Sequence, residues 1–357
     1  MASFGKQTAK VVFSGIQPTG VPQLGNYLGT IKNWVQLQQD PEAQRYYSIV
    51  DLHAMTVPRD PKRLKQETLE MAAALLACGI DTQKSVLFRQ STVPQHSQLN
   101  WVLGSITPVG WLNRMTQWKS KLQQQTNGIL DGVNEHSLNV HSSAAQGLLT
   151  GLFTYPVLMA SDILLFRASH IPVGEDQVQH LELARDLTVH FNKTFRTNLL
   201  VMPSYLLTAT KRVMSLRDPL RKMSKSDAND QARITLADTD DQIRKKIKKA
   251  PTDSLSQITF DPKSRPGVSN LLSIYAAVRN IDPRVAAQEM QTLANAQMKE
   301  MVAQAVVDEI TPIRKRLGEL LDDPQYIEDE LRKGEERARV VAEENWRQIA
   351  QCVGLPA

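Results

Sequence analysis

The sequence predicts an α/β protein, a Rossmann-like doubly wound parallel sheet with a helical C-terminal domain. Short apolar runs alternate with helical patterns through the first half of the chain, which is typical of βαβ units. A turn rich in glycine follows the first apolar run and leads directly into a helical pattern. Beyond about residue 228 the pattern is almost entirely helical. These observations place the sheet in the first part of the chain and a helical domain after it.

The elements of the expected sheet follow one another from the N-terminus. In order, they are a strand at Val11–Ser14, a helix at Asn26–Leu37, a strand at Tyr46–Val50, a helix at Pro61–Ala77 and a strand at Ser85–Gln90. Further helical patterns cover Leu152–Phe166 and Asp176–Phe191, and a loop-rich region runs from Met202 to Asp230. Parallel sheets of this kind bind ligands at the carboxyl ends of their strands.

One segment departs from this rhythm. Leu122–Thr150 is rich in Gln, Asn, Ser and Gly and contains no Lys or Arg. We interpret it as a long mobile loop, inserted and tolerated at the surface. We therefore predict two domains, a Rossmann-type catalytic domain at residues 1–228 with a polar insertion at 122–150, and a helical domain at residues 229–357.

Composition excludes several classes of protein. The 357 residues are 41% hydrophobic and 22% charged, which is ordinary for a globular protein with a large core. Apolar stretches are interrupted well before the roughly 18 to 20 residues that a membrane helix needs, so no membrane association is expected. Cys78 and Cys352 lack CxxC spacing, so we expect no metal site and a reducing compartment. No targeting signal is visible in the first ten residues.

Charge is unevenly distributed along the chain. Met1 to Asp227 contain 23 Lys and Arg against 16 Asp and Glu, whereas the remainder has 19 against 21. This excess favours phosphate-rich partners for the first part, although ordinary surface variation reaches this size. In the second part, Asp238, Asp240 and Asp241 precede a basic run from Arg244 to Lys249. Acidic residues at the start of a helix and basic residues at its end complement the helix dipole, so we expect a solvated helix there rather than a nucleic-acid contact.

The glycine-rich turn is the first candidate for a binding site. It reads Phe13-Ser-Gly-Ile-Gln-Pro-Thr-Gly20 and is followed by Gln23-Leu-Gly-Asn26 at the start of a helix. Glycine lets the backbone approach a ligand closely, and a helix N-terminus offers N–H groups and a positive dipole end to an anion. This arrangement suits a polyphosphate, but the glycines alone are weak evidence because many strand-to-helix turns contain them.

A second motif is far more specific. Lys222-Met-Ser-Lys-Ser226 lies in the loop-rich region, and its two lysines can neutralise charge that builds on a departing pyrophosphate. The pentapeptide resembles the KMSKS signature of class I aminoacyl-tRNA synthetases. By the same resemblance, the segment from Gln23 to Asn26 falls where that class carries its HIGH signature. Gly25 and Asn26 match it, whereas Gln23 replaces the expected His or Thr.

Four more segments resemble the tryptophanyl branch of this class. They are the turn from Phe13 to Gly20, Ile49-Val-Asp-Leu-His53, Thr154-Tyr-Pro-Val-Leu-Met-Ala-Ser-Asp-Ile-Leu-Leu165 and Pro172-Val-Gly-Glu-Asp-Gln-Val-Gln-His-Leu-Glu182. They occur in that family's order and spacing, and the similarity runs from Val12 to about Val353 apart from the polar insertion.

The resemblance implies a tryptophan–tRNA ligase. Such an enzyme activates L-tryptophan with ATP to tryptophanyl-adenylate, releases pyrophosphate and transfers the amino acid to the 3′-terminal adenosine of tRNA(Trp). It also implies that Mg²⁺ arrives with ATP, that the helical domain binds the anticodon, and that the protein is a homodimer.

Tryptophan recognition is expected to depend on one buried carboxylate. The indole N–H donates and does not accept, so a carboxylate is a natural partner, and the resemblance assigns this role to Asp162. A carboxylate within the apolar run from Leu158 to Phe166 is costly to bury unless it is paired. The other tryptophan contacts that the resemblance implies are Phe13, His53, Tyr155, Met159, Ile163, Val173 and Gln177. Core packing is an equally good interpretation for Met159 and Ile163, and His180 is expected to be structural.

ATP recognition is expected to use the turn, the helix start and the KMSKS-like loop. The implied ATP contacts are Gln17, Pro18, Thr19, Gly25, Asn26, Gly174, Glu175, Asp176, Val213, Lys222, Met223, Ser224, Lys225 and Ser226. Lys222, Ser224 and Lys225, with Lys121 from Trp118-Lys-Ser-Lys121, are the catalytic candidates. The reaction needs alignment and charge neutralisation more than acid–base catalysis, which suits lysines.

Alternatives remain open at this stage. A tyrosyl-tRNA synthetase shares the fold and loop but is disfavoured by Gly174-Glu-Asp-Gln177. A catalytically silent tRNA-binding paralogue would have lost phosphate-handling residues, and a small-molecule nucleotidylyltransferase would lack the long helical part. The chain resembles bacterial and organellar enzymes, and Asn113–Lys121 with the insertion resembles fungal mitochondrial ones. We therefore expect the mitochondrial matrix, with the bacterial cytoplasm as the alternative.

Overall fold

The protein is built around one parallel sheet. A computed structural model describes residues 10–115, 149–174, 177–207, 212–225, 227, 229–255 and 257–356. The five strands lie in the order β3-β2-β1-β4-β5, and every neighbouring pair is parallel. They are β1 Lys10–Ile16, β2 Ala43–Ile49, β3 Val86–Arg89, β4 His170–Val173 and β5 Ser204–Leu207. The order reverses direction between β1 and β4, so the predicted doubly wound fold is confirmed.

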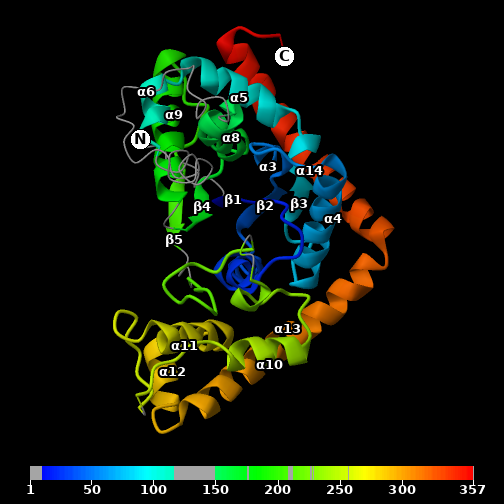
Figure 1. Cartoon of the computed structure of the whole chain (residues 1–357). Coiled ribbons are helices and arrows are strands. Elements are labelled where there is room, and N and C mark those ends of the chain that lie inside the picture. Colours follow the sequence, from blue (N-terminus) through cyan, green and yellow to red (C-terminus); the bar gives the residue numbers. More distant parts are fainter. Residues whose placement is uncertain are drawn as a thin grey trace.

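Helices cover the sheet and form a separate lobe beside it (Figure 1). Those before the KMSKS-like loop are α1 Leu24–Asn26, a π-helical turn η1 Tyr27–Ile31, α2 Lys32–Leu37, α3 Asp51–Ala54, α4 Pro61–Ala77, a 3-10 turn η2 Gln90–Thr92, α5 Gln95–Ile106, α6 Val109–Asn113, α8 Thr150–Leu165 and α9 Val178–Thr194. After the loop come a 3-10 turn η5 Asp230–Ala232, α10 Asp240–Lys248, α11 Pro266–Arg279, α12 Pro283–Glu289, α13 Asn295–Leu321 and α14 Pro324–Val353.

The best predicted element is α4, whose ends match the sequence expectation. Asp60 accepts a hydrogen bond from the backbone N–H of Arg63, and Pro61 occupies the first turn, where its missing N–H is not needed. The strands β1 to β3 are also confirmed within a few residues. By contrast, β5 lies in the region predicted to be loop-rich, because a four-residue edge strand is too short to show a periodic pattern. Residues 122–148 of the predicted insertion lie outside the described residues.

Two buried clusters hold the molecule together. One joins the helix beginning at Leu24 to α4 and to helices α10, α11 and α13, so it spans the predicted domain boundary. The other packs α5, α8 and α9 against the sheet and against α14. Figure 1 shows α10, α11 and α12 as a lobe below the sheet, with α13 leading away from it and α14 returning along the sheet. The boundary near residue 228 stays a prediction.

The helix that the acidic residues before the basic run predicted is α10. Thr239 and Gln242 form a capping box at its start. It is not wholly solvated, because Lys246 is only 2% exposed and pairs with Asp238 at 2.6 Å and Asp230 at 3.0 Å. In the part of the chain that the structure describes, no helix is long and apolar enough to cross a membrane.

The packing of α14 on β3 gives a test of the fold. A Cβ atom on Gly334 would collide with the carbonyl oxygen of Leu87. We expect Gly334→Ala to lower the free energy of unfolding by roughly 2 to 4 kcal/mol, because the helix or the strand must shift. Urea titration measures this. Gly318→Ala in α13 is the control, since a Cβ there meets nothing within 4 Å, and it should be neutral or stabilising. Equal effects of the two changes would contradict the packing.

Candidate functional site

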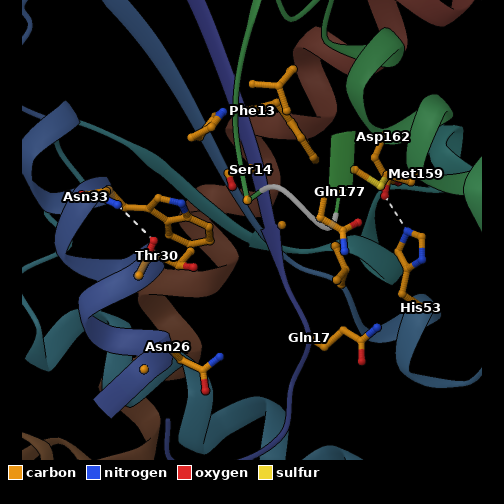
Figure 2. Close-up of a pocket in the computed structure, with 18 of the residues that line it drawn as sticks. Phe13, Ser14, Gln17, Asn26, Thr30, Asn33, His53, Met159, Asp162 and Gln177 are labelled. Atoms are coloured by element: carbon orange, nitrogen blue, oxygen red, sulfur yellow. Dashed lines mark hydrogen bonds and ion pairs between the residues drawn. The ribbon is translucent and has the colours of Figure 1, made fainter. Parts of the chain in front are cut away.

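A cavity of about 770 Å³ opens where β1 and β4 diverge. Its walls come from β1, the helix that begins at Leu24, and α8. Figure 2 shows Asn26, Thr30 and Asn33 on one side of β1 and His53, Met159 and Asp162 on the other. The predicted site residues that line it are Phe13, Gln17, Gly25, Asn26, His53, Tyr155, Met159, Asp162, Ile163, Gly174, Gln177, Val213 and Lys222. The structure therefore brings most of the predicted tryptophan contacts and six of the fourteen predicted ATP contacts into one cavity.

Asp162 is the buried charge of the cavity wall, with 1% of its surface exposed. Its carboxylate accepts hydrogen bonds from Gln90 Nε2 at 2.7 Å and from His53 Nε2 at 2.9 Å. The ring atom Nδ1 of His96 lies 2.7 Å from the carboxylate, close enough for an ion pair. The expectation that this carboxylate must be paired is confirmed. Its partners come from η2, α3 and α5, so three separate elements converge on it.

These neighbours keep Asp162 ionised. Burial by itself raises the pKa of this carboxyl, but His96 and His53 outweigh it and lower the pKa to about 2. Among the described residues, Gln90 and His53 donate to two of the roughly four acceptor positions of the carboxylate, and His96 adds an ion-pair contact. Acceptor capacity remains for a donor inside the cavity, whose wall includes Asp162. The geometry is that of a fixed anion that can accept a hydrogen bond from an N–H or O–H group.

His180 lies behind two side chains that line the cavity and holds both of them. The Tyr155 hydroxyl lies 2.9 Å from His180 Nε2, and Gln177 Oε1 lies 2.9 Å from Nδ1. Because the amide oxygen only accepts, Nδ1 carries the proton and Nε2 accepts from the tyrosine. His180 is completely buried, so its predicted structural role is confirmed. It orients two side chains that line the cavity.

Apolar side chains form the rest of this end. Met159 and Ile163 both line the cavity, and Ile163 also belongs to the buried cluster beneath it. Ile163 therefore contributes both to the wall of the cavity and to the hydrophobic core, which are the two interpretations that the sequence left open. Phe13, on β1, lines the cavity and stacks on Phe166, with ring centroids 5.7 Å apart. The wall is fixed by packing before any ligand arrives.

Gln23 has a different role from the one expected at its motif position. Its Oε1 accepts a hydrogen bond from the Gly25 N–H at 2.6 Å, which caps α1. Its Nε2 donates to the carbonyl of Met223 at 3.2 Å. A Cβ on Gly25 would lie 2.9 Å from Gln23 Oε1, so glycine is needed for this approach. The side chain joins the helix start to the KMSKS-like loop.

The KMSKS-like loop is anchored at its second residue. Met223 is 2% exposed, and its N–H donates to the Val213 carbonyl at 3.1 Å. Lys222 lines the cavity beside it. Lys225 is turned toward Gly20 instead, where burial lowers the pKa of its ammonium and Glu67 and Glu70 act in the opposite direction. The two lysines of the motif therefore occupy different places.

Some predicted residues are not part of the cavity wall. Of the described residues, Pro18, Thr19, Met223, Ser224 and Lys225 do not line it. Lys121, Glu175, Asp176 and Ser226 lie outside the described residues, as does the side chain of Val173. Their predicted roles stay predictions.

Several lining or supporting residues were missed. Thr30 and Asn33 share one helix face with the predicted Asn26 because the three are three or four residues apart, and that spacing is a signal in the sequence. Ser14 and Arg212 also line the cavity, and Gln90 and His96 hold Asp162. No local pattern marks the last two, since their partner lies far away along the chain.

Comparisons with known proteins agree with this geometry. A family model described as class I tRNA synthetases (W and Y) matches residues 6–311. The mitochondrial tryptophan–tRNA ligase of Schizosaccharomyces pombe is 43% identical over 348 residues, 96% of this chain and 95% of its own length. The tryptophan–tRNA ligase of Rickettsia conorii is 42% identical over 347 residues, 97% of this chain and 99% of its own. The crystal structure of the Campylobacter jejuni tryptophanyl-tRNA synthetase with ADP and tryptophan has a TM-score of 0.74 and 30% identity, covering 97% of this chain and 100% of that one.

The pairing of Asp162 predicts a pH dependence of stability. Its folded pKa of about 2 lies below the ordinary value of 3.8, so its contribution is present above about pH 4 and is lost as the pH falls toward 2. The loss is on the order of 2 kcal/mol. Urea unfolding of the wild-type protein and of Asp162→Asn between pH 2 and 6 measures it. Asp162→Asn should lack this part of the acid destabilisation, whereas a variant at the exposed Asp322 should keep it. An unchanged pH profile in Asp162→Asn would exclude the assignment.

Gln23 gives a second test at this site. Gln23→Ala loses both hydrogen bonds and should lower the free energy of unfolding by about 1 to 2 kcal/mol. Gln23→Glu keeps the acceptor for Gly25 but places a carboxylate against the Met223 carbonyl. Both variants should therefore release the loop, so trypsin should cleave after Lys222 faster than in the wild type. Unchanged cleavage rates in both would show that Gln23 does not hold the loop.

Proposed function

Because the chain belongs to the class I tRNA synthetases for tryptophan and tyrosine, we propose that it is a tryptophan–tRNA ligase. It activates L-tryptophan with ATP and transfers it to the 3′-terminal adenosine of tRNA(Trp). The observation that carries the proposal is the ionised, buried Asp162 in the wall of a cavity whose other end presents Lys222 and a helix N-terminus. One end suits an indole N–H and the other suits phosphates.

The choice of tryptophan over tyrosine is supported at the α8 end. The acceptor capacity left on Asp162 suits the indole N–H, which donates and never accepts. Met159 and Ile163 provide apolar surface for the ring. Tyr155 and Gln177, fixed by His180, are placed to contact the amino end of the substrate. The Campylobacter jejuni relative was crystallised with tryptophan, which supports this substrate class.

The ATP end is supported by the helix that begins at Leu24. Gly25 and Asn26, at the N-terminal end of this helix, line the cavity, and the helix dipole favours an anion there. Lys222 adds a formal positive charge. The Campylobacter jejuni structure contains ADP, which supports a nucleotide in this position. Gly174 and Val213 supply further wall on the same cavity.

Magnesium is proposed to enter as part of the ATP substrate. Among the described residues, no group of three or more His, Cys, Asp or Glu side chains is placed to hold a metal ion. The proposed chemistry uses no metal ligand from the described residues. Among them, Lys222 and Arg212 bring formal positive charge to the cavity wall, beside the helix end.

The chemistry proposed for this cavity is two displacements. A carboxylate oxygen of tryptophan attacks the α-phosphorus of ATP, the bond to the bridging β-phosphate oxygen breaks, and pyrophosphate leaves with that electron pair. The 2′-hydroxyl of the terminal adenosine of tRNA then attacks the acyl carbon, AMP leaves, and the hydroxyl proton passes to the departing phosphate or to water. The protein contributes alignment and charge neutralisation rather than a general base.

The oligomer, the helical domain and the location are finer parts of the proposal. Trp101 is 78% exposed on α5 and Val109 is 70% exposed on α6, and such large apolar side chains suit a face covered by a second copy in a homodimer.

Residues 229–357 are proposed to bind the anticodon, by stacking aromatic or arginine side chains on unpaired bases.

The Schizosaccharomyces pombe relative supports a mitochondrial location, and the equally similar Rickettsia conorii relative makes the bacterial cytoplasm the alternative.

ATP–pyrophosphate exchange tests the function directly. Exchange should be stimulated by tryptophan alone when each amino acid is supplied in turn. Asp162→Asn should raise the KM for tryptophan roughly 10- to 100-fold, the effect of losing one buried hydrogen bond of about 1 to 3 kcal/mol, with little change in the KM for ATP. Lys222→Ala should mainly lower the rate at saturating tryptophan. Stimulation by tyrosine, or equal effects of both variants on tryptophan binding, would refute these assignments.

A further inference from the structure

The helix at the proposed ATP end of the cavity contains one π-helical turn. Tyr27–Ile31 form this turn, and the N–H of Lys32 donates to the carbonyl of Tyr27. Such i→i+5 turns are rare, occur mostly as single turns inside α-helices and are frequent at functional sites. Thr30 lies in the turn and Asn33 follows it, and both line the cavity. The winding of this turn therefore sets the orientation of part of the cavity wall.

One carboxylate binds the two ends of the turn. Glu309 Oε1 accepts hydrogen bonds from the Tyr27 hydroxyl at 2.6 Å and from Lys32 Nζ at 2.7 Å. Glu309 belongs to α13, far along the chain from this helix. In a regular α-helix, residues five positions apart are separated by about 140° around the axis. The i→i+5 bond of the π-turn brings Tyr27 and Lys32 toward the same side, where a single carboxylate binds both.

Lys32 is also bound by a third element. Its Nζ donates to the carbonyl of Val278 at 2.9 Å and to that of Ala277 at 3.4 Å. Both carbonyls lie near the C-terminal end of α11, the negative end of the helix dipole, which favours a lysine. The side chains of Lys32 and Glu309 are 20% and 24% exposed, so their ion pair is largely shielded from water.

The Tyr27 hydroxyl acts as a donor in this arrangement. Tyr27 is buried, and burial together with the hydrogen bond to Glu309 raises the pKa of its phenol. The phenol is therefore protonated at neutral pH and donates to the carboxylate. Its ring belongs to the buried cluster that joins this helix to α11 and α13. Removing the carboxylate would leave a buried hydroxyl without its acceptor.

We propose that Glu309 is a positioning residue, which holds the π-turn in place and so orients Thr30 and Asn33 toward ATP. This inference rests on the proposed function, because it takes ATP to be the ligand that lies against this helix. Without Glu309, the turn can relax toward α-helical winding, which separates Tyr27 from Lys32. The same relaxation rotates Asn33 about the helix axis relative to the helix start.

The expected effect is on ATP and not on tryptophan. Figure 2 shows Thr30 and Asn33 on the opposite side of β1 from Asp162. Glu309→Ala removes two charge-assisted hydrogen bonds and should raise the KM for ATP roughly three- to tenfold. The KM for tryptophan should stay within about twofold of the wild-type value.

The rate at saturating substrates should change little. The start of the helix is held independently of Glu309, because the N–H of Leu24 donates to the Ile234 carbonyl at 2.8 Å and Gln23 caps the N–H of Gly25. We therefore expect kcat of Glu309→Ala to stay within about twofold of the wild-type value. A change in the KM for ATP without a matching change in kcat distinguishes positioning of the wall from a general loss of structure.

The experiment compares four full-length proteins in tryptophan-dependent ATP–pyrophosphate exchange. They are the wild type, Glu309→Ala, Glu309→Gln and Glu300→Ala. Glu300→Ala is the matched control, because Glu300 lies on the same helix and forms a 2.6 Å ion pair with Arg244 of α10 instead. It should leave the KM for ATP unchanged. Glu309→Gln keeps an oxygen that can accept from Tyr27 but loses the charge that pairs with Lys32, so its KM for ATP should be intermediate.

Three results would overturn the proposal. They are an unchanged KM for ATP in Glu309→Ala, an equal rise in Glu300→Ala, and a rise in the KM for tryptophan as large as that for ATP.

Hydrogen exchange tests the turn without activity. In the absence of substrates, a peptide covering residues 27–34 should exchange at least about threefold faster in Glu309→Ala than in the wild type, because the turn opens more often. Tyr27→Phe should accelerate exchange by a smaller factor, and it should add less in the Glu309→Ala background, where their shared hydrogen bond is already lost.

The two measurements separate this inference from the proposed function. Equal exchange of the peptide in Glu309→Ala and the wild type would show that Glu309 does not hold the turn. If the wild type showed no tryptophan-dependent ATP–pyrophosphate exchange, the proposed function would fail, and hydrogen exchange would still decide whether Glu309 holds the turn.

Discussion

The pairing of β1 with β2 on one side and β4 on the other is the constraint on which the site depends. Because the connections on the two sides of β1 run in opposite directions, a crevice opens at the carboxyl ends of β1 and β4. It is bordered by the helix that begins at Leu24 and by α8. Cavity, helix N-terminus and buried carboxylate all follow from this single change of direction.

The two ends of the cavity carry opposite charge. At the α8 end a carboxylate is buried and kept charged by two hydrogen-bond donors and one ion-pair partner from three elements, which makes it a rigid acceptor. At the other end the positive charge comes from a helix dipole and an exposed lysine, which can adjust to a flexible polyphosphate. Different parts of the structure therefore perform the two tasks: the buried carboxylate binds a ring N–H in a fixed position, and the exposed lysine and the helix end neutralise phosphates.

The sequence predicted those features whose cause is local. Asp60 and Pro61 mark the start of α4, and the charge inside an apolar run marks Asp162 as a residue that must have partners. The identity of those partners was not predictable, because Gln90 and His96 become neighbours of Asp162 only through the packing of η2 and α5 on α8. The same holds for Lys225, where the motif predicts the residue type but the influence of Glu67 and Glu70 of α4 on its ammonium depends on tertiary structure.

The covering of β3 by α14 has a consequence for the order of events during synthesis. β3 is an edge strand, and α14 packs on its backbone at Gly334 and pairs with Arg89 through Glu328 and Glu335. The helix that covers this strand is made more than 200 residues later than the strand itself. A nascent chain therefore carries an uncovered sheet edge through most of its translation, and such an edge is a template for pairing with other chains.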